Sequence, residues 1–195
     1  MSPKKYGAIK IIFIWSNFLT RKTFSLKIIL WRGLMSENSE ASLISEVGID
    51  YNPLKELLEK QNWASADEWT RTKILWMACC NNIGFLRDID VDNIPCKDLK
   101  TIDLLWSKYS NHRFGFTAQN QIWKEVNKDV EIFVERIGWR VNGKYRTHKE
   151  MIFELRAPKG HFPLEPMWKR FFGSEEETNL LWPEWLTEKM EKCGW

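Results

Sequence analysis

The apolar positions of the chain follow the spacing of α-helices rather than that of strands. Between residues 97 and 109, four large apolar side chains fall on one face of a helix: Leu99, Ile102, Leu105 and Trp106. No segment keeps the strict apolar–polar alternation of a half-buried strand. The pattern predicts an all-α fold, and the length of 195 residues suits a single compact helical domain with tails.

Helix-start motifs indicate where the first two helices of the chain begin. Asn52 followed by Pro53 predicts a helix whose N-cap is Asn52. Ser65 and Glu68 have the spacing of a capping box, which predicts a second helix from there to about Cys80. We therefore expect two amphipathic helices before residue 81.

The second half alternates short helices with irregular stretches. Residues 88–96 are expected to form a turn and residues 97–109 a helix. Thr117 is expected to cap the next helix, and a further helix covers about residues 129–137 and stops at Gly138. Two C-terminal helices are expected at residues 167–172 and 184–192, the latter opened by Pro183.

Residues 139–163 lack helical periodicity and are punctuated by glycine and proline. Irregular segments longer than about 12–15 residues are uncommon in compact domains, and they are usually functional or disordered. We therefore expect this segment to be a long loop that is either functional or disordered.

Tryptophan is unusually abundant, with twelve residues in the chain. Each indole buries a large apolar area and keeps one N–H donor. Two interpretations stay open for these side chains: a Trp-rich core, or a groove in which some of them line a flat, aromatic ligand.

The four cysteines are Cys79, Cys80, Cys96 and Cys193. They form no CxxC pair and no Cys/His metal-ligand spacing, and the three histidines are scattered. We expect free thiols, a reducing compartment and no metal site. The chain also lacks the phosphate-binding glycine motifs and the GxSxG and HExxH motifs, so we expect a protein that is not an enzyme.

Charge is distributed unevenly along the chain. Residues 1–36 carry seven basic and no acidic residues, which leaves 22 basic and 26 acidic residues (29 − 7 and 26 − 0) in the remainder. The net negative charge of the residues after position 36 argues against nucleic acid as a partner, because phosphate binding needs a basic face.

The basic, apolar start of the chain has three interpretations. It is a targeting segment, a surface for peripheral membrane association, or translated upstream sequence with Met35 as the true start. Residues 1–50 are then an N-terminal extension and linker outside the folded domain.

Six short motifs follow one another between residues 51 and 165. They are W-x-x-A-D at 63–67, IP-x-x-DL at 94–99, TID-x-LW at 101–106, RFGF with a following Gln at 113–119, GW at 138–139, and APKGH with a following Pro at 157–163. In this order they resemble the genomes uncoupled four family of magnesium chelatase regulators. After Pro163 the resemblance fades, and Tyr145 stands where the family often has Trp.

The resemblance implies a helical fold with a cupped, apolar ligand surface that a loop partly covers. Family members bind protoporphyrin IX and magnesium protoporphyrin IX, and they stimulate chlorophyll biosynthesis through the large, porphyrin-binding subunit of magnesium chelatase. For this chain it implies a tetrapyrrole-binding regulatory domain at residues 51–165, a helical tail at 166–195, and a location in a cyanobacterial cytoplasm or plastid stroma. We expect a monomer, because no apolar seam is evident. A tetrapyrrole sensor or adaptor, or a photoprotective porphyrin carrier, is the alternative.

A porphyrin is a flat apolar disc with two propionates at one edge, so it needs an aromatic floor and a basic rim. Phe116, Gln119 and Trp123 share one helical face. The expected porphyrin contacts are Arg113, Phe114, Phe116, Gln119, Trp123, Trp139, Tyr145, Phe153 and Lys159. The alternative for the rings is a place in the core, which we expect for Trp106. Asp67, Asp103 and His161 are expected to make structural hydrogen bonds.

Overall fold

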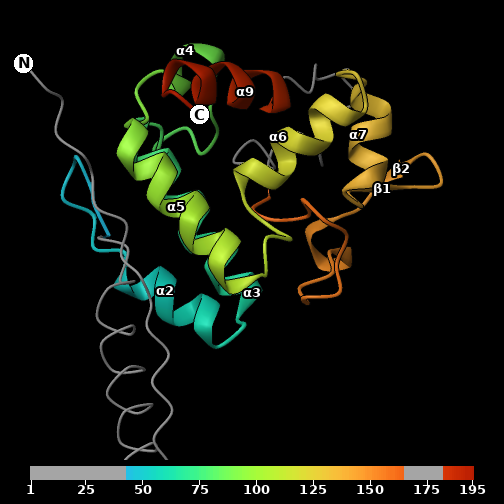
Figure 1. Cartoon of the computed structure of the whole chain (residues 1–195), viewed down its shortest axis with the longest axis horizontal. Helices are drawn as coiled ribbons and strands as arrows, with labels where there is room; N and C mark the ends of the chain where they lie inside the picture. The colour runs from blue at the N-terminus through green and yellow to red at the C-terminus, as the bar shows by residue number, and fades with distance from the viewer. Residues whose placement is uncertain (1–42, 165–181) are drawn as a thin grey trace, which may run out of the picture. The chain divides into compact units, whose positions relative to one another are not determined.

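The computed structural model describes residues 43–164 and 182–195, which belong to one unit, Leu43–Trp195. The described residues form seven α-helices, one 3-10 helix and one small hairpin (Figure 1). The helices are α2 (Asn52–Glu59), α3 (Trp63–Met77), α4 (Asp88–Val91), α5 (Cys96–Tyr109), α6 (Phe116–Glu125), α7 (Val130–Arg136) and α9 (Trp182–Lys192). The prediction of a helical fold is confirmed.

The helices pack on sequence neighbours and also form three long-range pairs, α2 with α5, α4 with α9 and α6 with α9. Helix α2 packs against α3 and α5, α5 against α6, and α6 against α7. Helix α9 returns to pack on α4 and α6, as Figure 1 shows. No described helix is long and apolar enough to cross a membrane. Residues 1–42 of the N-terminal extension and the helix expected at 167–172 lie outside the described residues. Residues 43–50 of the extension are described and contact α5, where the Thr101 hydroxyl donates to the Ile44 carbonyl at 2.8 Å.

Aromatic rings form the centre of the core. Trp106 of α5 is fully buried and lies between Trp63 of α3 and Phe162, with ring centroids 6.0 and 5.8 Å away. Its indole N–H donates to Thr70 Oγ1 at 3.0 Å. Phe114 meets the same rings edge-on. The expected core position of Trp106 is confirmed, and the core extends into the irregular segment that contains Phe162.

Two predicted helix starts are wrong by a small margin. Helix α3 begins at Trp63, and its N-cap is Asn62, whose side chain accepts from the Ser65 N–H at 3.3 Å. Helix α2 begins at Asn52 itself, so the N-cap is Tyr51. In both cases the cap lies ahead of the residue that the local motif indicated, and the aromatic residue at that point, Tyr51 or Trp63, is buried.

Helix α6 is capped from another helix. Thr117, the predicted cap, is the second helical residue, and Gly115 is the N-cap with φ +111° and ψ 167°. The Asp103 carboxylate on α5 accepts from the Thr117 N–H at 2.9 Å and from the Thr117 hydroxyl at 2.6 Å. The structural role expected for Asp103 is confirmed, and it fixes α6 against α5.

Gly115 makes this arrangement possible, and Gly115→Ala is expected to lower the free energy of unfolding by about 2–3 kcal/mol. A methyl group at this position would lie 2.6 Å from Asp103 Oδ1, on a backbone that only glycine adopts readily. Gly84→Ala is the matched control, since Gly84 also has positive φ (+74°) but nothing within 4 Å of an added methyl. Chemical denaturation measures both; equal losses in the two variants would contradict the capping account.

A small hairpin was not expected from the sequence. Strands β1 (Arg140–Val141) and β2 (Lys144–Tyr145) pair antiparallel, with Arg140 opposite Tyr145. Asn142 and Gly143 form the turn, and both have positive φ. Asn-Gly is the preferred pair for such two-residue turns, so this dipeptide was the overlooked signal. The 3-10 helix His148–Glu150 follows in the same irregular segment.

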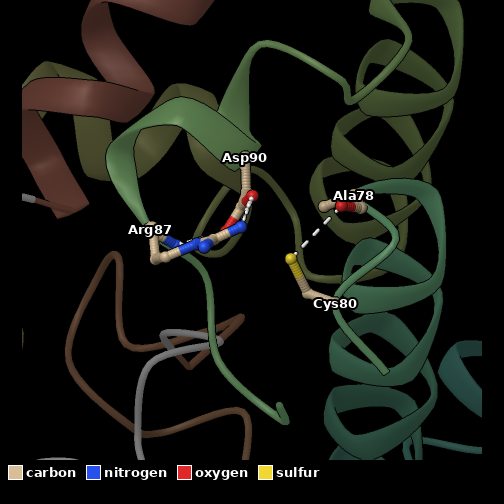
Figure 2. A network of polar contacts seen from close by, with 4 residues as sticks. All are labelled: Ala78, Cys80, Arg87 and Asp90. Atoms are coloured by element: carbon tan, nitrogen blue, oxygen red, sulfur yellow. Dashed lines mark hydrogen bonds and ion pairs between the residues drawn. The ribbon is translucent and has the colours of Figure 1, made fainter. Parts of the chain in front are cut away.

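Part of the expected turn at residues 88–96 is the short helix α4. Its start is held by Asp90, which accepts from the Arg87 backbone N–H at 2.9 Å and from the Arg87 guanidinium at 2.8 Å (Figure 2). The nearby Cys80 thiol donates to the Ala78 carbonyl at 3.2 Å. Burial, reinforced by Asp90, raises the pKa of Cys80 to about 11. Cys80 is therefore a structural, unreactive thiol.

The expectation of four free thiols is wrong for one pair. Cys96 and Cys193 form a disulfide, whereas Cys79 is exposed and free and Cys80 is buried and free. The bonded cysteines are 97 residues apart, and they meet because α9 returns to the start of α5. Sequence spacing carries no information about such a long-range pair.

Candidate functional site

The candidate site joins α6 to the irregular segment 139–164. Five of the expected porphyrin contacts are almost completely buried, with exposed fractions of 0–4%. They are Phe114, Phe116, Gln119, Trp123 and Trp139. Trp123 and Trp139 both pack edge-on against Phe133 of α7. These side chains are therefore part of the core in this conformation, and a ligand reaches them only if the segment moves.

Polar contacts tie the irregular segment down onto this core. The Gln119 amide donates to the carbonyls of Gly160 at 3.1 Å and Pro163 at 2.7 Å. The Arg113 guanidinium donates to the Ala157 carbonyl at 2.6 Å. Two of the expected ligand contacts thus close the segment over the rings.

The end of the segment is held by a buried carboxyl group. Asp67 of α3 accepts from the Leu164 N–H at 2.6 Å, which confirms its expected structural role. Burial raises the pKa of Asp67 to about 7. The Asp67 carboxyl group is therefore mostly protonated and uncharged below neutral pH.

The remaining expected contacts are accessible. Tyr145 and Phe153 are half-buried, as is Arg113, and Lys159 is exposed. Phe153 stacks on Phe162 with centroids 5.3 Å apart, and the Arg140 guanidinium lies 5.7 Å from the centre of the Tyr145 ring. Of the expected aromatic contacts, Tyr145 and Phe153 are the two that a ligand could touch without any rearrangement.

Lys159 lies at the edge of α6 rather than over the rings. Its ammonium group donates to Gln121 Oε1 at 2.7 Å. The structure thus brings Lys159 close to the solvent side of α6, while Gln119 and Trp123 on the same helix are buried.

Buried polar atoms without a partner are concentrated in this region. Among the described residues, the buried side-chain atoms without a hydrogen-bond partner are Arg113 Nε, Gln119 Oε1, Trp123 Nε1, Arg140 Nε, Arg146 Nε and His161 Nε2. More than about 90% of buried polar groups in proteins are hydrogen-bonded, so such a cluster calls for an explanation. Four of these atoms are hydrogen-bond donors, and three of the four are arginine Nε groups. An added acceptor could bond to them.

His161 contributes a neutral ring to this cluster. Its Nδ1 lies 2.6 Å from the Ile137 carbonyl, and because a carbonyl only accepts, Nδ1 carries the proton. Burial, reinforced by the Arg146 charge, lowers the pKa of His161 to about 4. The expected hydrogen-bonding role is confirmed, and the unpaired Nε2 is an acceptor.

His161 and Asp67 are expected to give opposite pH dependences of stability. The folded state takes up a proton at His161 less readily than the unfolded state. The contribution of His161 to the free energy of unfolding is therefore present above about pH 6.5 and is lost as the pH falls from 6.5 to 4. Asp67 holds its proton more tightly when folded, so its term is present at about pH 4 and is lost as the pH rises to 7.

We therefore expect His161→Gln to become less stable as the pH rises from 4 to 6.5, and Asp67→Asn to become more stable. In the wild type the two terms offset, each by about 1.4 kcal/mol per pH unit. Urea denaturation across this range measures all three proteins. The same slope in both variants would contradict the assignment.

A groove of about 390 Å³ lies between α4 and α9, apart from these residues. Its lining includes Ile89, Asp92, Trp185, Glu188 and Lys189, and none of the expected porphyrin contacts. Lys189 donates to the Asp92 carbonyl at 2.9 Å. A ligand could also bind in this groove, so experiments on the candidate site must distinguish binding at α6 from binding between α4 and α9.

Comparison with known proteins gives the family. A family model described as GUN4-like matches residues 44–175. The Ycf53-like protein of Synechocystis sp. is 38% identical over 125 residues, which cover 63% of this chain and 54% of that protein. The tetrapyrrole-binding protein, chloroplastic, of Arabidopsis thaliana is 33% identical over 131 residues, covering 61% and 49% respectively. The chain thus spans about half the length of the curated relatives it matches.

Solved structures show the same fold. GUN4 from Chlamydomonas reinhardtii superposes with a TM-score of 0.65 at 28% identity, covering 77% of this chain and 97% of that one. The ligand-free GUN4 of Arabidopsis thaliana gives a TM-score of 0.57 at 29% identity, covering 73% and 94%. The ordered motifs, the helical arrangement and the family match agree, and the chain belongs to the GUN4-like family.

Proposed function

We propose that the chain binds a tetrapyrrole between α6 and the segment 139–164. The observation that carries this proposal is the cluster of unpaired buried polar atoms around that segment. Arg113, Arg140 and Arg146 each leave Nε without a partner there, and carboxylates such as porphyrin propionates are strong acceptors for guanidinium groups. The Arabidopsis relative, a tetrapyrrole-binding protein, supports the same ligand class.

The geometry supports binding that is coupled to movement of the segment. Phe153 and Tyr145 give a first aromatic contact, whereas Phe114 and Trp123 are covered. The side chains of Arg113, Gln119 and Asp67 tie the segment down. Two backbone hydrogen bonds add to them, from the Gly115 N–H to the Phe162 carbonyl at 2.9 Å and from the Gly160 N–H to the Arg113 carbonyl at 2.7 Å. Ligand propionates that compete for Arg113 would free one of these ties, and the flat ring could then replace Phe162 over the aromatic floor.

We propose protoporphyrin IX or magnesium protoporphyrin IX as the ligand, and residues 51–165 as the regulatory part that binds it. Tetrapyrrole-binding proteins of this family are non-catalytic, so the role is binding and regulation. The named relatives come from a cyanobacterium and from organisms with plastids, which supports a cyanobacterial cytoplasm or a plastid stroma as the location.

The proposal is tested by titrating protoporphyrin IX against the fluorescence of the twelve tryptophans. Several of these indoles lie in or beside the candidate site, so a bound porphyrin should quench them. We expect saturable quenching with a single site and a dissociation constant on the order of micromolar. Quenching that grows linearly without saturation would reject tetrapyrrole binding.

Stimulation of magnesium chelatase through its large subunit is the finer part of the proposal. It is tested by adding the protein to a reconstituted chelatase at low magnesium concentration. Faster magnesium insertion supports an activator. Unchanged insertion by a protein that binds protoporphyrin IX would instead favour the sensor or carrier role.

A further inference from the structure

The Cys96–Cys193 disulfide holds the C-terminal end of the chain against the start of α5. Cys96 is the first residue of α5, and Cys193 directly follows α9. Both cysteines are half-buried, so the bond lies outside the fully buried core. One turn along α5, the Lys100 ammonium group donates to the Cys193 carbonyl at 2.7 Å. The disulfide and the exposed Lys100 side chain therefore hold the end of α9 to α5, and the Lys192 ammonium group holds it to Asp92 Oδ1 at 2.7 Å.

Helix α9 in turn supports α6, the helix of the candidate site. Thr187 donates its hydroxyl to Asn120 Oδ1 at 2.9 Å, and the Trp195 indole N–H donates to Thr117 Oγ1 at 3.2 Å. Thr117 and Asn120 point to a different side of α6 than Gln119 and Trp123, which face the candidate site. Thr117 is also the residue by which Asp103 fixes the start of α6. Helix α6 thus lies between α9 and the expected ligand.

We propose that Cys96–Cys193 is a regulatory redox site whose reduction by a protein or small-molecule dithiol loosens α9 and weakens tetrapyrrole binding at α6. The part that concerns binding rests on the proposed function. Disulfides in the reducing cytoplasm of mesophiles are usually transient or redox-sensing, and the proposed location is a reducing one. The half-buried position of the two cysteines fits that use better than a permanent structural link.

The reaction is a thiol–disulfide exchange. One thiolate of the dithiol attacks a sulfur of the Cys96–Cys193 bond, which breaks as a mixed disulfide forms. The second thiol of the reductant then displaces the remaining cysteine as a thiolate. Two electrons and two protons pass to Cys96 and Cys193, and the reductant leaves as its own disulfide.

Hydrogen exchange of the oxidised and dithiothreitol-reduced protein tests the release of α9. The Cys79→Ser background removes the exposed free thiol, while Cys80 stays buried. We expect exchange in residues 182–195 to accelerate about tenfold or more on reduction, since a local contact is lost, while α2 and α3 are unchanged. The double variant Cys96→Ser/Cys193→Ser should match the reduced protein and ignore dithiothreitol. If the variant does not fold, the reduced wild type still decides the result.

Protoporphyrin IX titration of the same samples tests the link to the site. We expect the affinity to fall by about fivefold on reduction, a typical size of coupling between sites. Unchanged exchange in α9 would overturn the proposal, and so would faster exchange with unchanged affinity. If the oxidised protein binds no protoporphyrin, the proposed function fails, whereas the exchange of α9 still tests the redox site.

Discussion

Replacing Trp106 by alanine is expected to lower the free energy of unfolding by about 3–5 kcal/mol. The indole is fully buried and stacks between Trp63 and Phe162, so its removal leaves a cavity at the junction of α3, α5 and the segment 139–164. It also deprives the buried Thr70 hydroxyl of its donor. Because domains are stable by only about 5–15 kcal/mol, the variant should be close to unfolding at 37 °C.

Chemical denaturation monitored by circular dichroism measures this loss. Trp76→Ala is the matched control, since Trp76 lies on α3 with 46% of its surface exposed. We expect the control to lose no more than about 1 kcal/mol. Comparable losses in the two variants would contradict the central place given to Trp106 in the core.

Replacing Arg146 by glutamine is expected to weaken protoporphyrin IX binding by about tenfold or more, the size of a lost charge-assisted hydrogen bond. Arg146 is half-buried, and its Nε is one of the unpaired atoms of the candidate site. Its Nη1 donates to the Glu150 carbonyl at 2.7 Å, which orients the guanidinium group in the irregular segment. Titration of tryptophan fluorescence measures the affinity.

Arg156→Gln controls for the loss of a positive charge in the same segment. Arg156 is exposed and pairs with Glu154, so the substitution should leave the affinity within about twofold of wild type. Thermal melts check that both variants are folded. Equal affinities in the two variants would show that the unpaired buried groups do not mark the ligand site.

The helices could be predicted from the sequence because their signal is local. The spacing of Leu99, Ile102 and Trp106 is set by two turns of one helix, and α5 and α7 lie within one residue of the predicted limits. The start of α6 could not be predicted in this way. The side chain that accepts from its first turn belongs to Asp103, fourteen residues before Thr117, so the signal depends on how α5 and α6 pack.

The candidate site was only partly predictable for a related reason. Helical spacing places Phe116, Gln119 and Trp123 on one face, but it does not show whether that face meets a ligand or other side chains. The structure shows that it meets the core and the carbonyls of Gly160 and Pro163. The disulfide lay beyond sequence reasoning as well, because the return of α9 to α5 is a tertiary event.

Hydrogen exchange with and without protoporphyrin IX tests the central claim most directly, since it locates binding along the chain. Residues 140–163 and α6 should exchange more slowly in the complex, because the irregular segment closes over the ligand. Helix α2, which packs on α3 and α5, should be unaffected. Saturable binding with protection confined to α4 and α9, which line the other groove, would contradict the account.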